Sequence, residues 1–316
     1  MANDEEFSVD LNPIPSVIVK SGKDIQKFNG SWYRGNSTNF IPSKKLLNQP
    51  NSIKEYILKG YFPPKPFIEK DTVITAFGSC FAQHITKHLI SNGFNVLGKK
   101  LKIDSHLIRF GEGIVNTFAI LEQLDWAFNN KNLSEGLWFG NNKEVVIPDE
   151  NIRVNTKNLL LKTRVLIITI GLSEIWYDKQ SNRVFWRAVP ANIFDNKRHG
   201  FRNSTVEENS KNLKSIISII RDKNPECKII FTLSPIPLMA TFRKINCISA
   251  NTISKAILRV ALDSIDYGEK EGVFYFPSYE LVKEVFVDPY KDDNRHIKEV
   301  YTDQIMSIFE NYYCVK

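Results

Sequence analysis

The chain has 316 residues and a mass of 36.4 kDa, enough for one large α/β domain or two small ones. Hydrophobic residues make up 42% and aromatic residues 12% of it, which predicts a sizeable core and excludes a disordered chain. The net charge of +7 comes from dispersed basic residues, with no run of five like charges and no stripe of arginines and aromatics. This pattern argues against nucleic acid as a partner and is compatible with a small anionic ligand.

Three features indicate a cytoplasmic protein without a membrane span. The most apolar segment, residues 164–171, is far too short to cross a bilayer. The first ten residues, MANDEEFSVD, carry acids where a secretory signal has a basic and then an apolar stretch. The four cysteines are too sparse for a disulfide scaffold and lack the CxxC spacing of zinc sites; they are Cys80, Cys227, Cys247 and Cys314.

Residues 1–70 differ in composition from residues 71–316. They contain half of the fourteen prolines, and proline restricts both its own backbone and that of the preceding residue. We therefore expect an irregular N-terminal arm over residues 1–70, with one short helix near 52–59, and an α/β domain over residues 71–316.

The domain begins with a β-branched strand at 72–77, which ends at Gly78. Apolar residues at 81, 85 and 89 then predict one face of a helix that stops at Asn92–Gly93. A strand at 94–97 and an amphipathic helix at 114–128 follow. Residues 164–171 (RVLIITIG) are apolar on both faces, as a buried strand of a parallel sheet is.

The alternation of strands and helices continues to the end of the chain. A capping box, formed by Ser204 or Thr205 with Glu207 or Glu208, precedes a helix that reaches about 221. The next elements are a strand at 228–233, a helix at 249–265, a strand at 273–276 and a helix at 297–312. This order predicts a three-layer α/β/α sandwich with about five parallel strands, whose chemistry lies at the carboxyl ends of the strands.

Polar side chains follow two of these strands. Gly78 permits a tight turn that puts Ser79 and Cys80 at a helix N-terminus, where free backbone N–H groups favour negative charge and a nucleophile can be activated. The alternative is that Ser79 is a helix cap and Cys80 a small buried residue. Ser173 and Glu174 follow the strand that ends at Gly171, either as groups of a site or as a turn with a capping glutamate.

Three further patterns have the residue types of functional sites. Asp293 precedes His296 by three residues, a spacing that suits a base oriented by a carboxylate. Arg198, His199 and Arg202 precede a helix N-terminus and form a weaker candidate for anion binding, an exposed basic loop being the alternative. His84 and His88 are four residues apart but lack a third ligand, so no metal site is predicted. No phosphate-binding glycine motif is present, and no cofactor is required.

FGSCFA at 77–82 resembles the signature of the GSCFA family. Five more segments resemble that family, and the similarity extends from about Asn36 to Ile308: TFAILEQLDWAF at 117–128, GLSEIWYD at 171–178, SPIPLMATF at 234–242, ANTISKAILR at 250–259 and FPSYE at 276–280. The family is grouped with the SGNH-type hydrolases, which include esterases, lipases and carbohydrate O-acyltransferases. The resemblance implies an SGNH or flavodoxin-like sandwich, in agreement with the periodicity.

The resemblance also implies roles for individual residues. Aligning the glycine of the superfamily's Gly-Asp-Ser with Gly78 puts Cys80 in the nucleophile position, whereas residue identity favours Ser79. The closing Asp-x-x-His corresponds to Asp293 and His296. The Gly-x-Asn-Asp block corresponds to Gly171–Glu174, but its oxyanion-holding Asn is Ser173 here. The superfamily's oxyanion glycine would fall at Gly111 or Gly113, and Asn116 in the same segment is a substitute donor.

The sequence thus predicts an ester hydrolase or O-acyltransferase that acts on a carbohydrate or glycan precursor through a covalent acyl-enzyme, with acyl-CoA as one compatible donor. The alternative is a non-catalytic carbohydrate-binding or scaffold protein that retains the fold. The oligomeric state is not predicted.

Overall fold

The computed structural model describes residues 6–10, 16–21, 24–29, 39–98, 103–110, 113–131 and 149–316. It divides into two compact units, residues 1–59 and 60–316. The first unit contains an antiparallel sheet of β1 (Glu6–Asp10), β2 (Ser16–Ser21) and β3 (Asp24–Asn29), followed by α1 (Lys44–Leu47) and a π-type helix, η1 (Ile53–Leu58). The short helix was predicted, but the three strands were not. An irregular arm was expected from the prolines, and the three strands occupy stretches that contain none of them.

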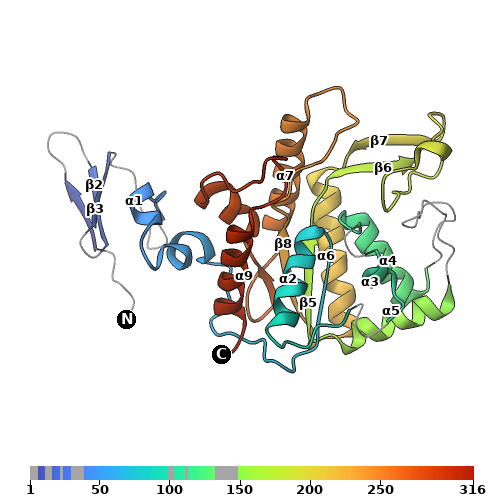
Figure 1. The fold of residues 1–316 in the computed structure, drawn as a ribbon, viewed down its shortest axis with the longest axis horizontal. Coiled ribbons are helices and arrows are strands. Elements are labelled where there is room, and N and C mark those ends of the chain that lie inside the picture. Colours follow the sequence, from blue (N-terminus) through green and yellow to red (C-terminus); the bar gives the residue numbers. More distant parts are fainter. Residues whose placement is uncertain are drawn as a thin grey trace. The chain divides into compact units, whose positions relative to one another are not determined.

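The second unit is built on a parallel sheet of four strands in the order β4-β5-β8-β9 (Figure 1). The strands are β4 (Ile74–Phe77), β5 (Val165–Ile170), β8 (Lys228–Leu233) and β9 (Val273–Tyr275). The predicted strand at 94–97 is reduced to one parallel bridge between Val96 and Ile74, beside β4. The α/β fold class with a parallel sheet is therefore confirmed, with four full strands where about five were expected.

Helices cover both faces of this sheet. On one face α2 (Cys80–Ser91) packs against α9 (Glu299–Tyr313), and Figure 1 shows both in front of the strands with α6 behind them. The other layer consists of α4 (Thr117–Asn129), α5 (Glu150–Lys162), α6 (Val206–Lys223) and α7 (Cys247–Asp263). The predicted capping box is confirmed at Thr205 and Glu208, in front of α6.

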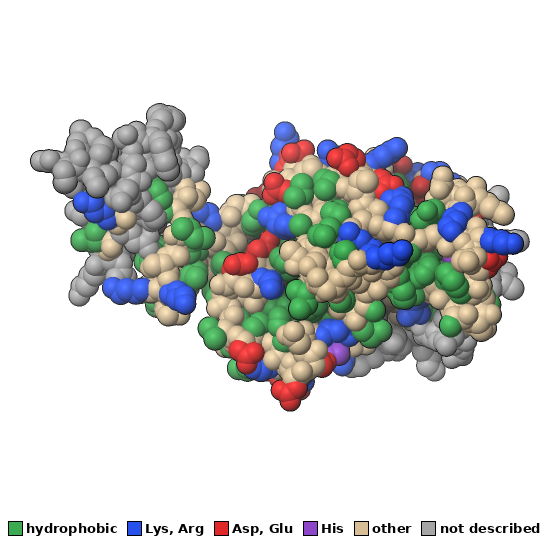
Figure 2. Space-filling view, turned by 90° about the horizontal axis from the view of Figure 1, so that it is seen from above, with side chains coloured by type: hydrophobic (Ala, Val, Ile, Leu, Met, Phe, Trp, Pro, Cys, Tyr) green, Lys and Arg blue, Asp and Glu red, His purple; other side chains and the backbone are tan. Residues whose placement is uncertain are grey.

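Several short elements complete the unit. An antiparallel hairpin of β6 (Glu174–Asp178) and β7 (His199–Asn203) follows β5 and was not predicted, nor was α5. Short helical turns among the described residues are α3 (His106–Arg109), η3 (Ala191–Ile193), α8 (Ser278–Glu280) and η4 (Leu281–Val285). On the face shown in Figure 2, lysines and arginines are intermixed with acidic and apolar side chains.

The strand order reverses direction between β4 and β5. The chain passes from β4 through α2 to the Val96 bridge on one side, and all later strands are added on the other side. In open α/β sheets, ligands bind at the carboxyl ends of the two strands that flank such a reversal. Gly78 lies at this point, directly after β4, with φ of +129°. A Cβ built on Gly78 would lie 2.0 Å from the carbonyl oxygen of Thr169 in β5, so only glycine lets the two backbones approach this closely.

A buried lysine joins the carboxyl ends of β5 and β8. Lys255 of α7 is almost completely buried, and its Nζ donates to the carbonyl oxygens of Gly171 (3.0 Å) and Ser234 (2.8 Å). Burial, with a smaller contribution from the charge of Arg295, lowers the pKa of Lys255 to about 7. The loops that follow the two central strands are therefore held by one amine.

We expect Gly78→Ala to destabilise the second unit far more than Gly93→Ala. Both glycines have positive φ, but a Cβ on Gly93 would meet nothing within 4 Å. Gly93→Ala should therefore cost only backbone strain, roughly 1–2 kcal/mol, whereas Gly78→Ala adds a backbone clash and should cost on the order of 4 kcal/mol or prevent folding. Urea denaturation measures both values. Equal losses would show that the contact with Thr169 does not constrain the turn.

The pH dependence of stability should carry a component from Lys255. Between pH 7 and the ordinary lysine pKa of 10.5, the unfolded chain binds a proton at this residue that the folded chain does not. The free energy of unfolding of the wild type, relative to Lys255→Met, should therefore be greatest above pH 10.5 and fall as the pH falls to about 7. Urea titrations between pH 6.5 and 9.5 test this, with the exposed Lys211→Met as the control; parallel curves for wild type and Lys255→Met would contradict it.

Candidate functional site

The N-terminus of α2 presents the first two candidate nucleophiles. Ser79 is the N-cap residue, and its Oγ accepts a hydrogen bond from the backbone N–H of Phe81 at 3.1 Å. Cys80 is the first residue of the helix and is half-buried. Ser79 thus has the helix-capping role that was one of its two predicted roles. A hydroxyl that accepts the cap bond can still donate its own proton, so both side chains stay candidates.

Asp293 and His296 form a hydrogen-bonded pair in the loop before α9. One carboxylate oxygen of Asp293 contacts Nδ1 of His296, and the other accepts the backbone N–H groups of Arg295 (3.0 Å) and His296 (2.9 Å). The hydrogen bond with His296 is the main cause that lowers the pKa of Asp293 to about 2, and the backbone bonds add to it. Because Nδ1 is engaged, Nε2 is the ring nitrogen available as a base.

Two histidines follow Cys80 along α2. Cys80, His84 and His88 are four residues apart and therefore form one row along the helix. Burial lowers the pKa of His84, and the charges of Lys87 and His296 lower it further. His296 is therefore among the charged groups that influence His84, one turn after Cys80. The loop that carries His296 is fixed in turn by Arg295, whose Nε donates to the carbonyl oxygen of Pro237 at 3.3 Å.

The turn after β5 and the turn before α4 meet at Ser79. Gly171 donates its backbone N–H to the carbonyl oxygen of Val115 at 2.9 Å. A Cβ on Gly171 would lie 3.8 Å from Cβ of Ser79. Asn116 is the N-cap of α4: its Oδ1 accepts from Ala119 N–H (2.8 Å) and its Nδ2 donates to the carbonyl oxygen of Trp186 (3.3 Å). One amide hydrogen of Asn116 is therefore already used within the fold.

Two of the predicted site residues are held inside the protein. Ser173 is completely buried, and its hydroxyl and backbone N–H are hydrogen-bonded to Oγ of Ser254 at 3.1 and 3.0 Å. Glu174 is nearly buried and accepts from the hydroxyl of Thr241 at 3.0 Å, with Nη1 of Arg243 3.6 Å away. These contacts fix the loop after β5. They give Ser173 no open position from which its hydroxyl could hold an oxyanion.

The basic residues proposed for anion binding are paired within the chain. Arg198 donates to Asp178 at 2.6 Å, and Arg202 donates to both carboxylate oxygens of Glu208 at 2.7 and 2.8 Å. His199 accepts the backbone N–H of Asp195 at 2.9 Å, and burial is the main cause that lowers its pKa. The geometry therefore gives no support to an anion site at this loop.

No group of three or more His, Cys, Asp or Glu that could hold a metal ion is found among the described residues. His88, one of the two histidines considered for such a site, instead contacts Glu310 of α9 at 2.8 Å. Within the same described ranges, no helix has the length and apolar character needed to span a membrane.

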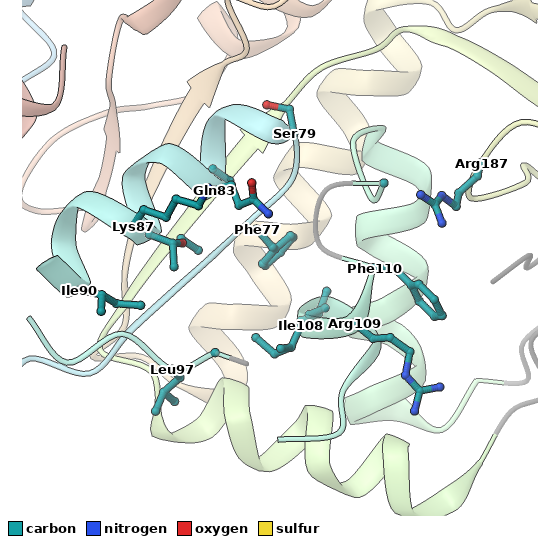
Figure 3. Close-up of a pocket in the computed structure, with 16 residues that line it drawn as sticks. Phe77, Ser79, Gln83, Lys87, Ile90, Leu97, Ile108, Arg109, Phe110 and Arg187 are labelled. Atoms are coloured by element: carbon teal, nitrogen blue, oxygen red, sulfur yellow. The ribbon is translucent and has the colours of Figure 1, made fainter. Parts of the chain in front are cut away.

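A cavity of about 330 Å³ opens beside α2 (Figure 3). Its wall on α2 is formed by Ala82, Gln83, Thr86, Lys87 and Ile90, and α3 with Gly113 and Arg187 forms the opposite wall. Ser79 is among the residues that line this cavity, and Cys80 is not.

Sequence reasoning missed the cavity. One feature of the sequence points to the cavity. Gln83, Lys87 and Ile90 are three or four residues apart on the predicted helix, so they form a second face of that helix beside the buried one. Nothing in the local sequence connects Arg187, about a hundred residues later, with this face.

Comparison with known proteins gives a family and a distant structural likeness. No curated protein matches the chain. Among solved structures, a crystal structure described as a GDSL-like lipase from Parabacteroides merdae is similar with a TM-score of 0.40 and 12% identity, over 80% of this chain and all of that one. The sequence profile of the GSCFA family matches residues 73–309, which is three quarters of the chain and includes every candidate site residue named above. The chain therefore belongs to the GSCFA family.

Proposed function

We propose that this protein is an acyl-ester hydrolase or O-acyltransferase that works through a covalent acyl-enzyme on a carbohydrate or glycan precursor. The observation that carries the proposal is the hydrogen-bonded Asp293–His296 pair, in which the carboxylate engages Nδ1 of the imidazole. A nucleophile at a helix N-terminus, a base and a residue that orients the base are the three parts that covalent acyl transfer needs.

In the proposed reaction the sulfur of Cys80 attacks the carbonyl carbon of an ester or thioester while Nε2 of His296 accepts the thiol proton. The tetrahedral intermediate collapses, the bond to the leaving group breaks, and His296 returns the proton to the departing alcohol or thiol. Water or a sugar hydroxyl then attacks the thioester on Cys80, its proton passes to His296, and Cys80 leaves as the thiol. Asp293 is a positioning residue that holds the tautomer of His296. Ser79 is the alternative nucleophile in the same scheme.

The oxyanion would be held by backbone N–H groups at the start of α2 and by the remaining amide hydrogen of Asn116. Groups at a helix N-terminus suit this task because they are fixed before the charge develops. Gly171 packs against Val115 at the turn that adjoins Ser79, and Gly113 packs against the guanidinium of Arg187. The choice of water or a sugar hydroxyl as acceptor separates an esterase from a transferase, and acyl-CoA is one donor that the scheme accommodates without any bound cofactor.

One observation favours a second function, a carbohydrate-binding or scaffold protein without catalysis. Ser173 stands where related enzymes carry the oxyanion-holding Asn, and its hydroxyl is buried and hydrogen-bonded to Ser254. A protein of this kind would bind glycans and form no acyl-enzyme.

Intact-mass spectrometry after brief incubation with acetyl-CoA or p-nitrophenyl acetate tests the proposal. We expect the wild type to gain the mass of one acetyl group, and Cys80→Ala and His296→Ala to gain none. Cys247→Ala is the matched control, because Cys247 is also a half-buried thiol at the first position of a helix, α7. Loss of the adduct in Ser79→Ala with retention in Cys80→Ala would assign Ser79 instead. No adduct with either donor would support the binding protein.

Asp293→Asn should slow acylation while leaving the fold intact, because Asp293 is exposed and acts through His296. Loss of an oriented base lowers a rate by roughly 10²-fold or more. The rate of p-nitrophenol release, with Asp292→Asn as a neighbouring control, measures the effect. An unchanged rate would remove Asp293 from the mechanism.

A further inference from the structure

The two carbonyl groups that Lys255 holds lead to different parts of the candidate site. Its Nζ donates to the carbonyl oxygen of Gly171, in the turn after β5, and to that of Ser234, in the loop after β8. β5 and β8 are neighbours in the sheet (Figure 1). Because Lys255 is only 1% exposed, the amine has no water to exchange for these partners, and it fixes the separation of the two loops.

From Gly171 the connection leads to the candidate nucleophiles. The backbone N–H of Gly171 donates to the carbonyl oxygen of Val115, in the turn before α4. A Cβ on Gly171 would lie 3.3 Å from Cβ of Val115 and 3.8 Å from Cβ of Ser79. The position of Gly171 therefore constrains the start of α2, where Ser79 and Cys80 lie.

From Ser234 the connection leads to the base. Ser234–Pro237 has the sequence Ser-Pro-Ile-Pro and directly follows β8, and its two prolines fix their own φ angles. The carbonyl oxygen of Pro235 accepts the hydroxyl of Tyr290 at 3.1 Å, and that of Pro237 accepts Nε of Arg295 at 3.3 Å. This short, stiff segment thus joins Lys255 to both Tyr290 and Arg295.

The loop that contains Asp293 and His296 is closed on itself, so these two contacts position all of it. Tyr290 and Ile297 form an antiparallel bridge, and the backbone N–H of Lys291 donates to the carbonyl oxygen of His296 at 2.7 Å. A displacement of the Ser234–Pro237 segment would therefore carry the imidazole of His296 with it.

We propose that Lys255 is a positioning residue for acyl transfer, which aligns His296 with the nucleophile at the start of α2 by holding Gly171 and the Ser234–Pro237 segment at a fixed separation. The assignment rests on the proposed function. Lys255 touches neither the substrate nor the reacting atoms in this scheme, and it acts only through backbone carbonyls. Such alignment matters because a misplacement of about 1 Å can lower a rate by roughly 10²-fold.

Solution NMR of the full chain tests the connection without any turnover. We expect Lys255→Met to shift the backbone amide resonances of Arg295 and His296, because the long apolar side chain leaves the carbonyl of Ser234 unpaired and frees the segment that carries their loop. Ser254→Ala is the matched control. Ser254 precedes Lys255 in α7 and is equally buried, but it contacts Ser173 instead, so this variant should leave the two resonances in place.

A double-mutant cycle on the acylation rate tests the role in catalysis. Lys255→Met should slow p-nitrophenol release roughly tenfold or more, and Tyr290→Phe, which removes one hydroxyl, should slow it less. The double variant should be no slower than Lys255→Met, because both substitutions break the same connection. When Ser254→Ala replaces Lys255→Met in the cycle, the two effects should multiply, as they do for independent sites.

Two results would overturn the proposal: unshifted resonances of Arg295 and His296 in Lys255→Met, or effects of Lys255→Met and Tyr290→Phe that multiply. If Lys255→Met does not fold, Tyr290→Phe alone is decisive, since it should shift the amide resonance of Gly171 on the other side of Lys255, and an unshifted resonance contradicts the connection. A wild type that forms no acyl-enzyme would refute the proposed catalysis, and the NMR shifts would then still show whether Lys255 links the two loops.

Discussion

The close approach of two backbones at Gly78 and Thr169 is the constraint on which the site depends. A residue with a Cβ at position 78 cannot lie against β5, so the chain could not turn there from β4 directly into α2. Because that turn is tight, the first residues of α2 lie over the carboxyl ends of β4 and β5, next to Gly171. The candidate nucleophiles, the loop after β5 and the cavity beside α2 all take their positions from this contact.

A second group of contacts fixes the loops around that point, and all of them use buried polar atoms. Lys255 joins the carbonyls of Gly171 and Ser234, and Ser254, its neighbour in α7, holds Ser173. Such groups are costly to bury unless each finds a partner, so they specify one arrangement of the loops. These contacts hold the loops at the carboxyl edge of the sheet in place. The Asp293–His296 loop is more exposed than they are, and it is attached to this edge through the hydrogen bond of Arg295.

The sequence carried enough information for the parts of the fold that are locally consistent. Lys228–Leu233 is a strand with the predicted bounds, because β-branched and apolar residues form one uninterrupted run between turn residues. The hairpin of β6 and β7 and helix α5 were missed, since Glu174–Asp178 reads as a polar site motif and α5 is rich in Asn and Lys. The Asp293–His296 pair was predictable because the two residues lie three apart. Lys255, Gly113 and Arg187 were not, because their partners come from other elements of the fold.

The burial of Lys255 has a consequence for chemical reactivity. An amine with a pKa near 7 is largely unprotonated at mildly alkaline pH and is therefore a better nucleophile toward acylating reagents than an ordinary lysine. In the closed protein, however, no reagent can reach it, since it is only 1% exposed. Modification of this one lysine can proceed only when α7 separates from the sheet. The rate at which Lys255 is labelled would therefore measure the local opening of the sheet edge that carries the candidate site.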